Sequence, residues 1–284
     1  MSGHPGQVAP RWRRGPEALG AAVRGQGRKL GRAVLYVGGI MRLLGSAARR
    51  TVLALMGRGT RIRASTLTHQ MVRVGVRSIP IIMLVQVFIG VILALNLAPT
   101  LKDYGQLERV ADVVAISVFR ELGPLITAII LSGFAGASIA AELGAMVEGE
   151  EIKALRAHAL DPIRFLVVPR IIATTVMLVG LTVLADVVGV FGGLLTATLV
   201  LDVSARMYMD LTQAALSLGD YFTGLFKAGV FGTIIASLAC YEGLNVRGGA
   251  EGVGQATTTT VVKSIVALIG ADALFTVVFY TLGW

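Results

Sequence analysis

Five charged side chains lie within long apolar stretches of this sequence or at their edges: Arg120, Glu121, Asp186, Lys227 and Asp272. A charge at the centre of a bilayer costs roughly 2.5–3.5 kcal/mol even on the most lenient insertion scale. Such groups are therefore expected to face a bundle interior or a watery cavity, each paired with an opposite charge. Two bases and three acids allow internal pairing, for instance of Lys227 with Asp272 on consecutive apolar segments.

Two roles fit these charges. They can be structural pairs, or they can line a polar cavity for a substrate that has a charged head group and apolar tails. In the second role Arg120 and Lys227 are candidates to contact an anion such as phosphate. The planar guanidinium of Arg120 could bind it in bidentate fashion.

Small residues recur at every fourth position of the apolar segment that follows Glu121. One row consists of Ser132, Gly136, Ala140 and Gly144. A second row beside it consists of Gly133, Ala137, Ala141 and Ala145, and Gly189 and Gly193 repeat the spacing later. Such rows let helix backbones approach closely where no hydrophobic effect drives helices together. They indicate tight packing, either within the chain or along a homodimer seam.

Signatures of catalysis are missing from the sequence. The glycine-rich stretch 242–260, which we interpret as a loop, has no Lys before its Thr run and is therefore not a phosphate loop. No nucleophile–base motif is present, and the single Cys240 offers neither a disulfide nor a metal-ligand cluster. We expect no catalytic residue, metal or cofactor on this chain, so driven transport would need a partner protein or an ion gradient.

The composition is that of an integral membrane protein. Of the 284 residues, 55% are hydrophobic and only 15% are charged. In a typical soluble domain, about a quarter of the residues are charged. Because about 20 apolar residues cross a hydrocarbon core of about 30 Å, we expect an all-α fold of five transmembrane helices. They are centred on residues 79–98, 122–141, 171–201, 221–241 and 265–284.

The N-terminal part is strongly basic. Residues 1–77 hold fifteen Lys or Arg and one acid, Glu17, a pattern that favours a cytoplasmic segment beside anionic lipid over one that binds nucleic acid. We expect a flexible tail over residues 1–27. An interfacial amphipathic helix is expected over 28–64, although a cytosolic helix packed on a partner fits equally. Residues 65–284 would then form the membrane domain.

The distribution of basic residues predicts a cytoplasmic N-terminus and, after five spans, a C-terminus on the outer side. The loop between the second and third spans is the most charged part of the membrane domain and contains a predicted short helix at 150–160. This helix is a candidate contact for a nucleotide-hydrolysing subunit. It could also be a solvated loop without a partner.

One stretch carries a family resemblance. Residues 120–173 read RELGPLITAIILSGFAGASIAAELGAMVEGEEIKALRAHALDPIRFLVVPRIIA, which resembles the signature of the MlaE/YrbE permease family. Residues 187–195 (VVGVFGGLL) and 252–279 resemble further blocks of that family, and the likeness covers about residues 65–284. This resemblance implies the membrane subunit of an MCE-type ABC phospholipid transporter.

The resemblance also implies partners and site residues. It implies that the chain forms a homodimer and works with a cytoplasmic ATPase, which binds ATP and Mg, and with a periplasmic MCE-domain protein. The expected location of the chain is a bacterial inner membrane; a plastid envelope is the alternative. Its substrate-cavity positions match Arg120, Glu121, Lys227 and Asp272. Its coupling helix lies at the predicted 150–160 helix, with Glu150, Glu151, Lys153, Arg156 and Asp161 as candidate contacts.

Two residues depart from the family pattern. Phe134 stands where the family commonly has Arg, and Lys153 stands where an acid is frequent. Two other functions remain open from the sequence. An ion-coupled secondary transporter would use Asp186, Lys227 and Asp272 as coupling groups, and a membrane scaffold would use the buried charges only for structure.

Overall fold

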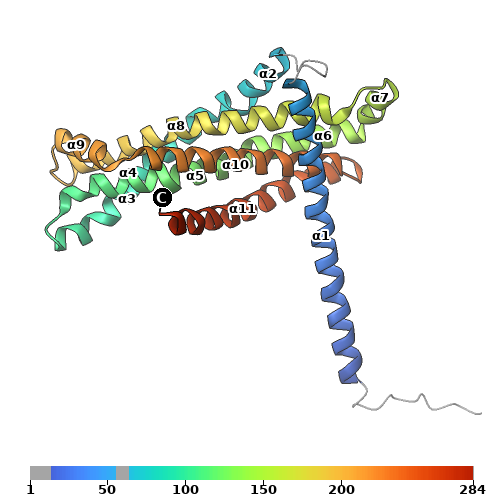
Figure 1. The fold of residues 1–284 in the computed structure, drawn as a ribbon, viewed down its shortest axis with the longest axis horizontal. Helices are drawn as coiled ribbons and strands as arrows, with labels where there is room; N and C mark the ends of the chain where they lie inside the picture. The colour runs from blue at the N-terminus through green and yellow to red at the C-terminus, as the bar shows by residue number, and fades with distance from the viewer. Residues whose placement is uncertain (1–13, 56–63, 284) are drawn as a thin grey trace, which may run out of the picture. The chain divides into compact units, whose positions relative to one another are not determined.

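The computed structural model describes residues 14–55 and 64–283, and over these ranges the chain is helical without strands (Figure 1). The chain divides into two compact units, Met1–Gly45 and Ser46–Trp284. The main helices follow in chain order. They are α1 (Arg14–Leu55), α2 (Ala64–Val74), α3 (Ile79–Asp103), α4 (Val110–Ser117), α5 (Gly123–Leu131), α6 (Ala137–Glu148), α7 (Glu151–Ala157), α8 (Val168–Leu199), α9 (Ala205–Ala215), α10 (Leu218–Leu244) and α11 (Gly249–Leu282).

Helix α1 is one continuous helix, which begins within the segment 1–27 that we expected to be a tail. Residues 1–13 of that segment, and 56–63 at the end of the expected interfacial helix, lie outside the described residues. Among the apolar residues of this helix, Val34, Val37 and Met41 are exposed. Placement of this helix in the membrane interface remains a prediction.

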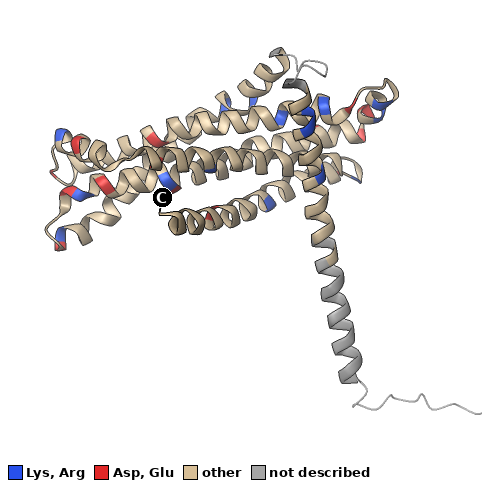
Figure 2. Ribbon diagram, in the orientation of Figure 1, with Lys and Arg blue, Asp and Glu red and all other residues tan. Residues whose placement is uncertain are grey.

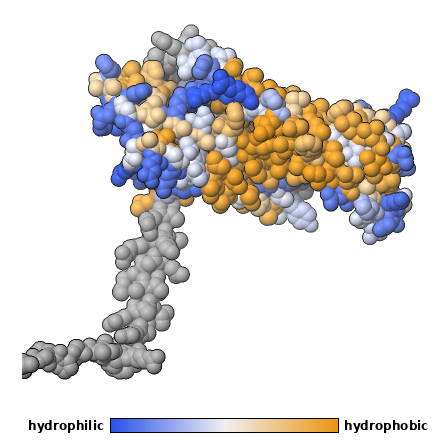
Figure 3. All heavy atoms as spheres, turned by 180° about the vertical axis from the view of Figure 1, so that it is seen from behind, coloured by the Kyte–Doolittle hydropathy of each residue, from blue (hydrophilic) through white to orange (hydrophobic). Residues whose placement is uncertain are grey.

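Among the residues that the structure describes, five helical stretches are long and apolar enough to span a membrane, which confirms the predicted number. They are Ser65–Asp103, Leu107–Glu148, Ile163–Leu199, Leu218–Leu244 and Gly249–Leu282. Each begins before the range that we predicted for it, and three of the five also end beyond that range. Figure 3 shows the resulting surface, an apolar band between two hydrophilic ends.

The second and third spans are interrupted by π-helical segments that the sequence did not reveal. These are η4 (Val118–Leu122) and η5 (Ser132–Gly136) in the second span and η6 (Ile163–Val167) at the start of the third. A π turn holds an extra residue and shifts the side chains that follow around the helix axis, and such turns are frequent at functional sites. The Arg120–Glu121 pair lies on η4, and Phe134 lies at the centre of η5.

Small residues let the spans pack closely. A methyl group added at Gly90 of α3 would lie 1.9 Å from the carbonyl oxygen of Gly189 on α8, so these two helices touch through their backbones. The predicted row Ser132, Gly136, Ala140 and Gly144 is buried in the same chain. Its glycines face side chains of α10 and α11, such as Ile235 and Val253. This row therefore packs within the chain and is not available as a dimer seam.

The two ends of the bundle in unit Ser46–Trp284 differ. At one end, here called the α9 end, the short helix α9 links the third and fourth spans. Its Tyr208 is fully buried, and burial raises the pKa of that phenol. At the other, the α7 end, α7 links the second and third spans (Figure 1). The glycine-rich stretch 242–260 is not a loop, because α10 ends at Leu244 and α11 already begins at Gly249.

Candidate functional site

Lys227 of α10 is the centre of a charged cluster between three spans. Its side chain is only 1% exposed. The ammonium group donates hydrogen bonds to Glu121 Oε2 at 2.6 Å and to Thr276 Oγ1 at 3.2 Å, and it lies 3.0 Å from Asp272 Oδ1. The predicted pairing of Lys227 with Asp272 is thus confirmed, and Glu121 joins the pair as a second carboxylate.

The cluster is held together by side chains on facing helices. On α11, Asp272 and Thr276 are one turn apart and therefore share a face. The Thr276 hydroxyl donates to Glu121 Oε1 at 2.9 Å. Since Glu121 lies on η4, this network fastens the second, fourth and fifth spans together.

Arg120, the neighbour of Glu121, reaches a different carboxylate. Its Nε lies 3.4 Å from Asp220 Oδ1 at the start of α10. Asp220 is also the acid of a capping box, in which its carboxylate accepts from Ser217 N at 2.8 Å. The sequence S-x-x-D before the fourth span signals such a cap, so Asp220 could have been found from its spacing. Thr276 carries no comparable signal.

A cavity of about 330 Å³ opens beside the cluster. Its lining residues are Ile116, Ser117, Arg120, Glu121, Thr223, Lys227, Thr276, Phe279 and Tyr280. Arg120 and Glu121 are each about one third exposed, so both a guanidinium and a carboxylate are available on the cavity wall. Three of the four predicted cavity residues line this space, and the fourth, Asp272, lies behind Lys227.

An apolar cavity of about 290 Å³ adjoins the charged one. It is lined by Phe222, Thr223, Phe226 and Phe279, and it shares Thr223 and Phe279 with the charged cavity. Further aromatic rings stand behind it, since Phe275 and Phe279 stack with centres 6.0 Å apart. The polar and the apolar cavity are therefore neighbours that share two wall residues, an arrangement that suits a molecule with a charged head and an apolar tail.

Asp186, the remaining intramembrane charge, lies apart from this cluster. It is 3% exposed and packs against the second span at Gly123, where an added methyl group would be 1.8 Å from its Oδ1. Within the described residues this oxygen has no hydrogen-bond partner. Nothing in its surroundings brings it to Lys227 or Asp272, with which an ion-coupled mechanism would combine it.

The candidate coupling residues gather at the α7 end. Glu151, Lys153 and Arg156 are exposed on α7, while Ile152 is 7% exposed and anchors the helix. Glu150, directly before α7, adopts a left-handed backbone conformation with φ of 59°. Its hydrogen bond from Lys153 lowers the pKa of the Glu150 carboxyl.

Asp161 has a different environment from the other candidates. Its carboxylate forms an ion pair with Arg50, in the last turns of α1, and accepts from the backbone N–H of Ile163 at 3.1 Å. Within the unit Ser46–Trp284, the segment after α7 is therefore fixed to α1. Sequence spacing could not reveal this contact, because the two residues are 111 positions apart.

Comparison with known proteins places this architecture in a family. The model of the family described as Permease MlaE matches residues 67–278. A probable ABC transporter permease protein of Rickettsia felis is 37% identical over 76% of this chain and 83% of its own length.

Two further relatives carry names that refer to lipid or to an organelle. The intermembrane phospholipid transport system permease protein MlaE of Haemophilus influenzae is 32% identical over 85% of this chain and 94% of its own length. The chloroplastic protein TRIGALACTOSYLDIACYLGLYCEROL 1 of Arabidopsis thaliana is 34% identical over 75% of this chain and 61% of its own length. This five-span chain, with its charged cluster between the second, fourth and fifth spans, belongs to the MlaE permease family.

Proposed function

We propose that this chain is the permease subunit of an ABC-type phospholipid transporter. The observation that carries the proposal is the charged cavity at Lys227, which continues into an aromatic cavity through Thr223 and Phe279. A phospholipid has a charged head and apolar chains, which match these two spaces. Arg120 can accommodate the phosphate group, and Glu121 can accommodate an ammonium group where the head has one.

Energy for transport would come from a separate ATPase that binds ATP and Mg. Helix α7 is suited to dock it, because Glu151, Lys153 and Arg156 are exposed and Ile152 holds the helix against the bundle. Asp161 and Arg50 would transmit movement of this segment to α1. The α7 end would then lie in the cytoplasm.

We further propose that two copies of the chain pair in the membrane. Helix α11 offers the largest unpartnered surface among the spans, since only 6% of its most apolar window is buried. The outer row of small residues, Gly133, Ala137, Ala141 and Ala145, is partly or fully exposed and could pack against a second copy. A periplasmic MCE-domain protein would exchange lipid with the pair at the α9 end, between the inner and outer membranes of a bacterium.

The test is reconstitution of the purified chain in liposomes, with and without its ATPase and MCE partners. We expect ATP-dependent transfer of a fluorescent phospholipid to acceptor vesicles. Arg120→Gln should slow this transfer at least tenfold, whereas the exposed Arg206→Gln on α9 should transfer at the wild-type rate. Size-exclusion chromatography of both variants checks folding.

Two results would contradict the proposal. Transfer that follows an ion gradient and ignores ATP would indicate a secondary transporter. Full transfer by a folded Arg120→Gln variant would show that the charged cavity does not handle the head group.

A further inference from the structure

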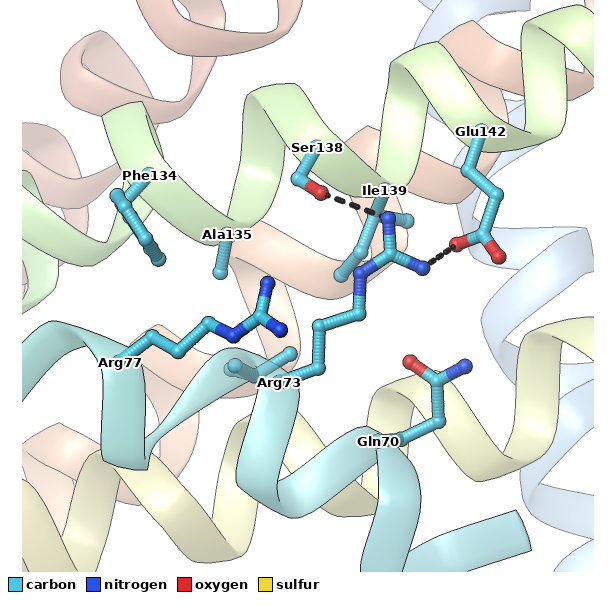
Figure 4. A pocket seen from close by; sticks show the side chains of 9 residues that line it. Gln70, Arg73, Arg77, Phe134, Ala135, Ser138, Ile139 and Glu142 are labelled. Atoms are coloured by element: carbon cyan, nitrogen blue, oxygen red, sulfur yellow. Dashed lines mark hydrogen bonds and ion pairs between the residues drawn. The ribbon is translucent and has the colours of Figure 1, made fainter.

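A second charged cavity, of about 220 Å³, lies toward the α7 end of the bundle (Figure 4). It is lined by Gln70, Arg73, Val74, Arg77, Phe134, Ala135, Ser138, Ile139 and Glu142. The first four come from α2 and the 3₁₀ turn η2 (Val76–Ser78), and the others come from η5 and α6. Along the second span, Glu142 is 21 residues beyond Glu121, roughly 30 Å at 1.5 Å per residue. This cavity is therefore distinct from the one at Lys227.

Two arginines, Arg73 and Arg77, lie in the wall of this cavity. Gln70, Arg73 and Arg77 are three and four residues apart and so lie on one face of the helix. Arg73 already has two partners: its Nη1 lies 2.8 Å from Glu142 Oε2, and its Nη2 donates a hydrogen bond to Ser138 Oγ at 3.2 Å. Glu142 is the one acid among the lining residues.

Glu142 is already shared by two arginines. Arg170 of α8, whose side chain is 4% exposed, also binds its Oε2, at 2.9 Å. The single carboxylate of Glu142 balances only one of the two positive charges of Arg73 and Arg170. The region around Glu142 therefore carries an excess of positive charge even before Arg77 is counted.

Two polar side chains in the cavity have no hydrogen-bond or ion-pair partner among the described residues. Among the residues that the structure describes, Arg77 forms no hydrogen bond or ion pair, and its guanidinium points into the cavity beside Ala135 (Figure 4). Gln70 is 9% exposed, and its amide points into the same space without a hydrogen bond to any described residue. The amide of Gln70 and the guanidinium of Arg77 can therefore both bind a ligand or water that enters the cavity.

The cavity wall also has apolar members. Phe134 is 45% exposed, and Val74, Ala135 and Ile139 line the same space. An anion that also carries an apolar part could therefore place its charge on the arginines and its tail along these side chains.

We propose that this cavity binds a phosphate group, presented by the head of a phospholipid in the leaflet at the α7 end. Arg77 contributes a bidentate guanidinium, Gln70 contributes an amide donor, and Ser138 lies beside Arg73 to complete the polar wall. Together with the cavity at Lys227, to which the proposed function assigns a lipid head group, the chain would have two lipid-head sites at different depths along its second span. The proposal concerns binding only and stands whether or not the chain transports lipid.

Hydrogen–deuterium exchange of the purified full-length chain in an uncharged detergent tests this site. Phosphatidylglycerol should slow exchange in peptides covering residues 64–78 and 132–142. Diacylglycerol, which lacks the phosphate, should not. Arg77→Gln should weaken the phosphatidylglycerol effect about tenfold and Arg77→Lys less, because Lys keeps the charge but loses the bidentate geometry. Arg206→Gln, at the α9 end, is the matched control and should behave as the wild type.

Each outcome decides the question. Protection by phosphatidylglycerol that Arg77→Gln loses supports a lipid head group. Protection of the same peptides by inorganic phosphate, with no effect of the lipid, supports the phosphate site but assigns it to a soluble anion. Equal protection of wild type and Arg77→Gln, or none by either probe, overturns the proposal. Native mass spectrometry counts bound lipids and confirms that the variants remain folded.

Discussion

At the scale of single residues, the chain shows how a lysine can be buried between membrane spans. Lys227 is 1% exposed but has Glu121, Asp272 and Thr276 around its ammonium group. Removal of one member of a buried ion pair is more harmful than replacement of the whole group, because the charges left behind have no partner. A comparison of a single variant with a variant of the whole cluster can therefore separate its structural role from its proposed role in transport.

Lys227→Met should destabilise the chain by about 3–5 kcal/mol, since the carboxylates of Glu121 and Asp272 lose their counter-charge. The triple variant Lys227→Met, Glu121→Gln, Asp272→Asn should recover most of this loss. It should still fail to transfer phospholipid. Thermal unfolding at one fixed scan rate measures the first two effects, and the liposome assay measures the third.

Lys102→Met, at an exposed site near the end of α3, serves as the control and should leave both measurements unchanged. Normal transfer by a stable triple variant would assign the cluster a purely structural role, as the scaffold function requires. A Lys227→Met variant as stable as the wild type would show that the carboxylates are protonated or hydrated without the lysine.

At the scale of elements, the sequence predicts the number of spans because each span requires a long, predominantly apolar stretch. The pairing of Lys227 with Asp272 follows from the cost of a buried charge. The π segments η4 and η5 were not predictable, because an extra residue in a turn leaves no mark on composition or on an apolar run. The role of the small-residue row at Gly136 stayed open until the structure showed α10 and α11 packed against it.

The approach of α3 to α8 gives a prediction at this scale. Gly90→Ala should destabilise the bundle by about 1–3 kcal/mol, the usual cost of overpacking, because the new methyl group would meet the backbone of Gly189. Gly180→Ala on α8 is the matched control, since no atom lies within 4 Å of the added methyl group, and it should be neutral or slightly stabilising. Thermal unfolding in detergent compares the two, and equal midpoints would contradict the close contact.

At the scale of the whole membrane domain, basic residues are unevenly divided between the two ends (Figure 2). At the α7 end, basic residues lie on α2 and η2, on α7 and at the nearby helix ends; they are Arg73, Arg77, Lys153, Arg156, Arg164, Arg170 and Arg247. Those at the α9 end are Lys102, Arg109 and Arg206. Because an excess of Lys and Arg in short loops is typical of the cytoplasmic side, this asymmetry predicts that the α7 end, with its proposed ATPase contact, faces the cytoplasm.

Cysteine labelling can test this orientation, because the chain's own Cys240 is fully buried. Single cysteines are introduced at two exposed positions, Glu151→Cys on α7 and Arg206→Cys on α9. In spheroplasts, a membrane-impermeant maleimide should label Arg206→Cys at once and Glu151→Cys only after lysis, while the unmodified chain stays unlabelled. The reverse pattern would place α7 in the periplasm. A cytoplasmic ATPase could then not reach α7, and the proposed coupling role of α7 would be wrong. The Arg77 cavity would then face the periplasmic leaflet instead of the cytoplasmic one.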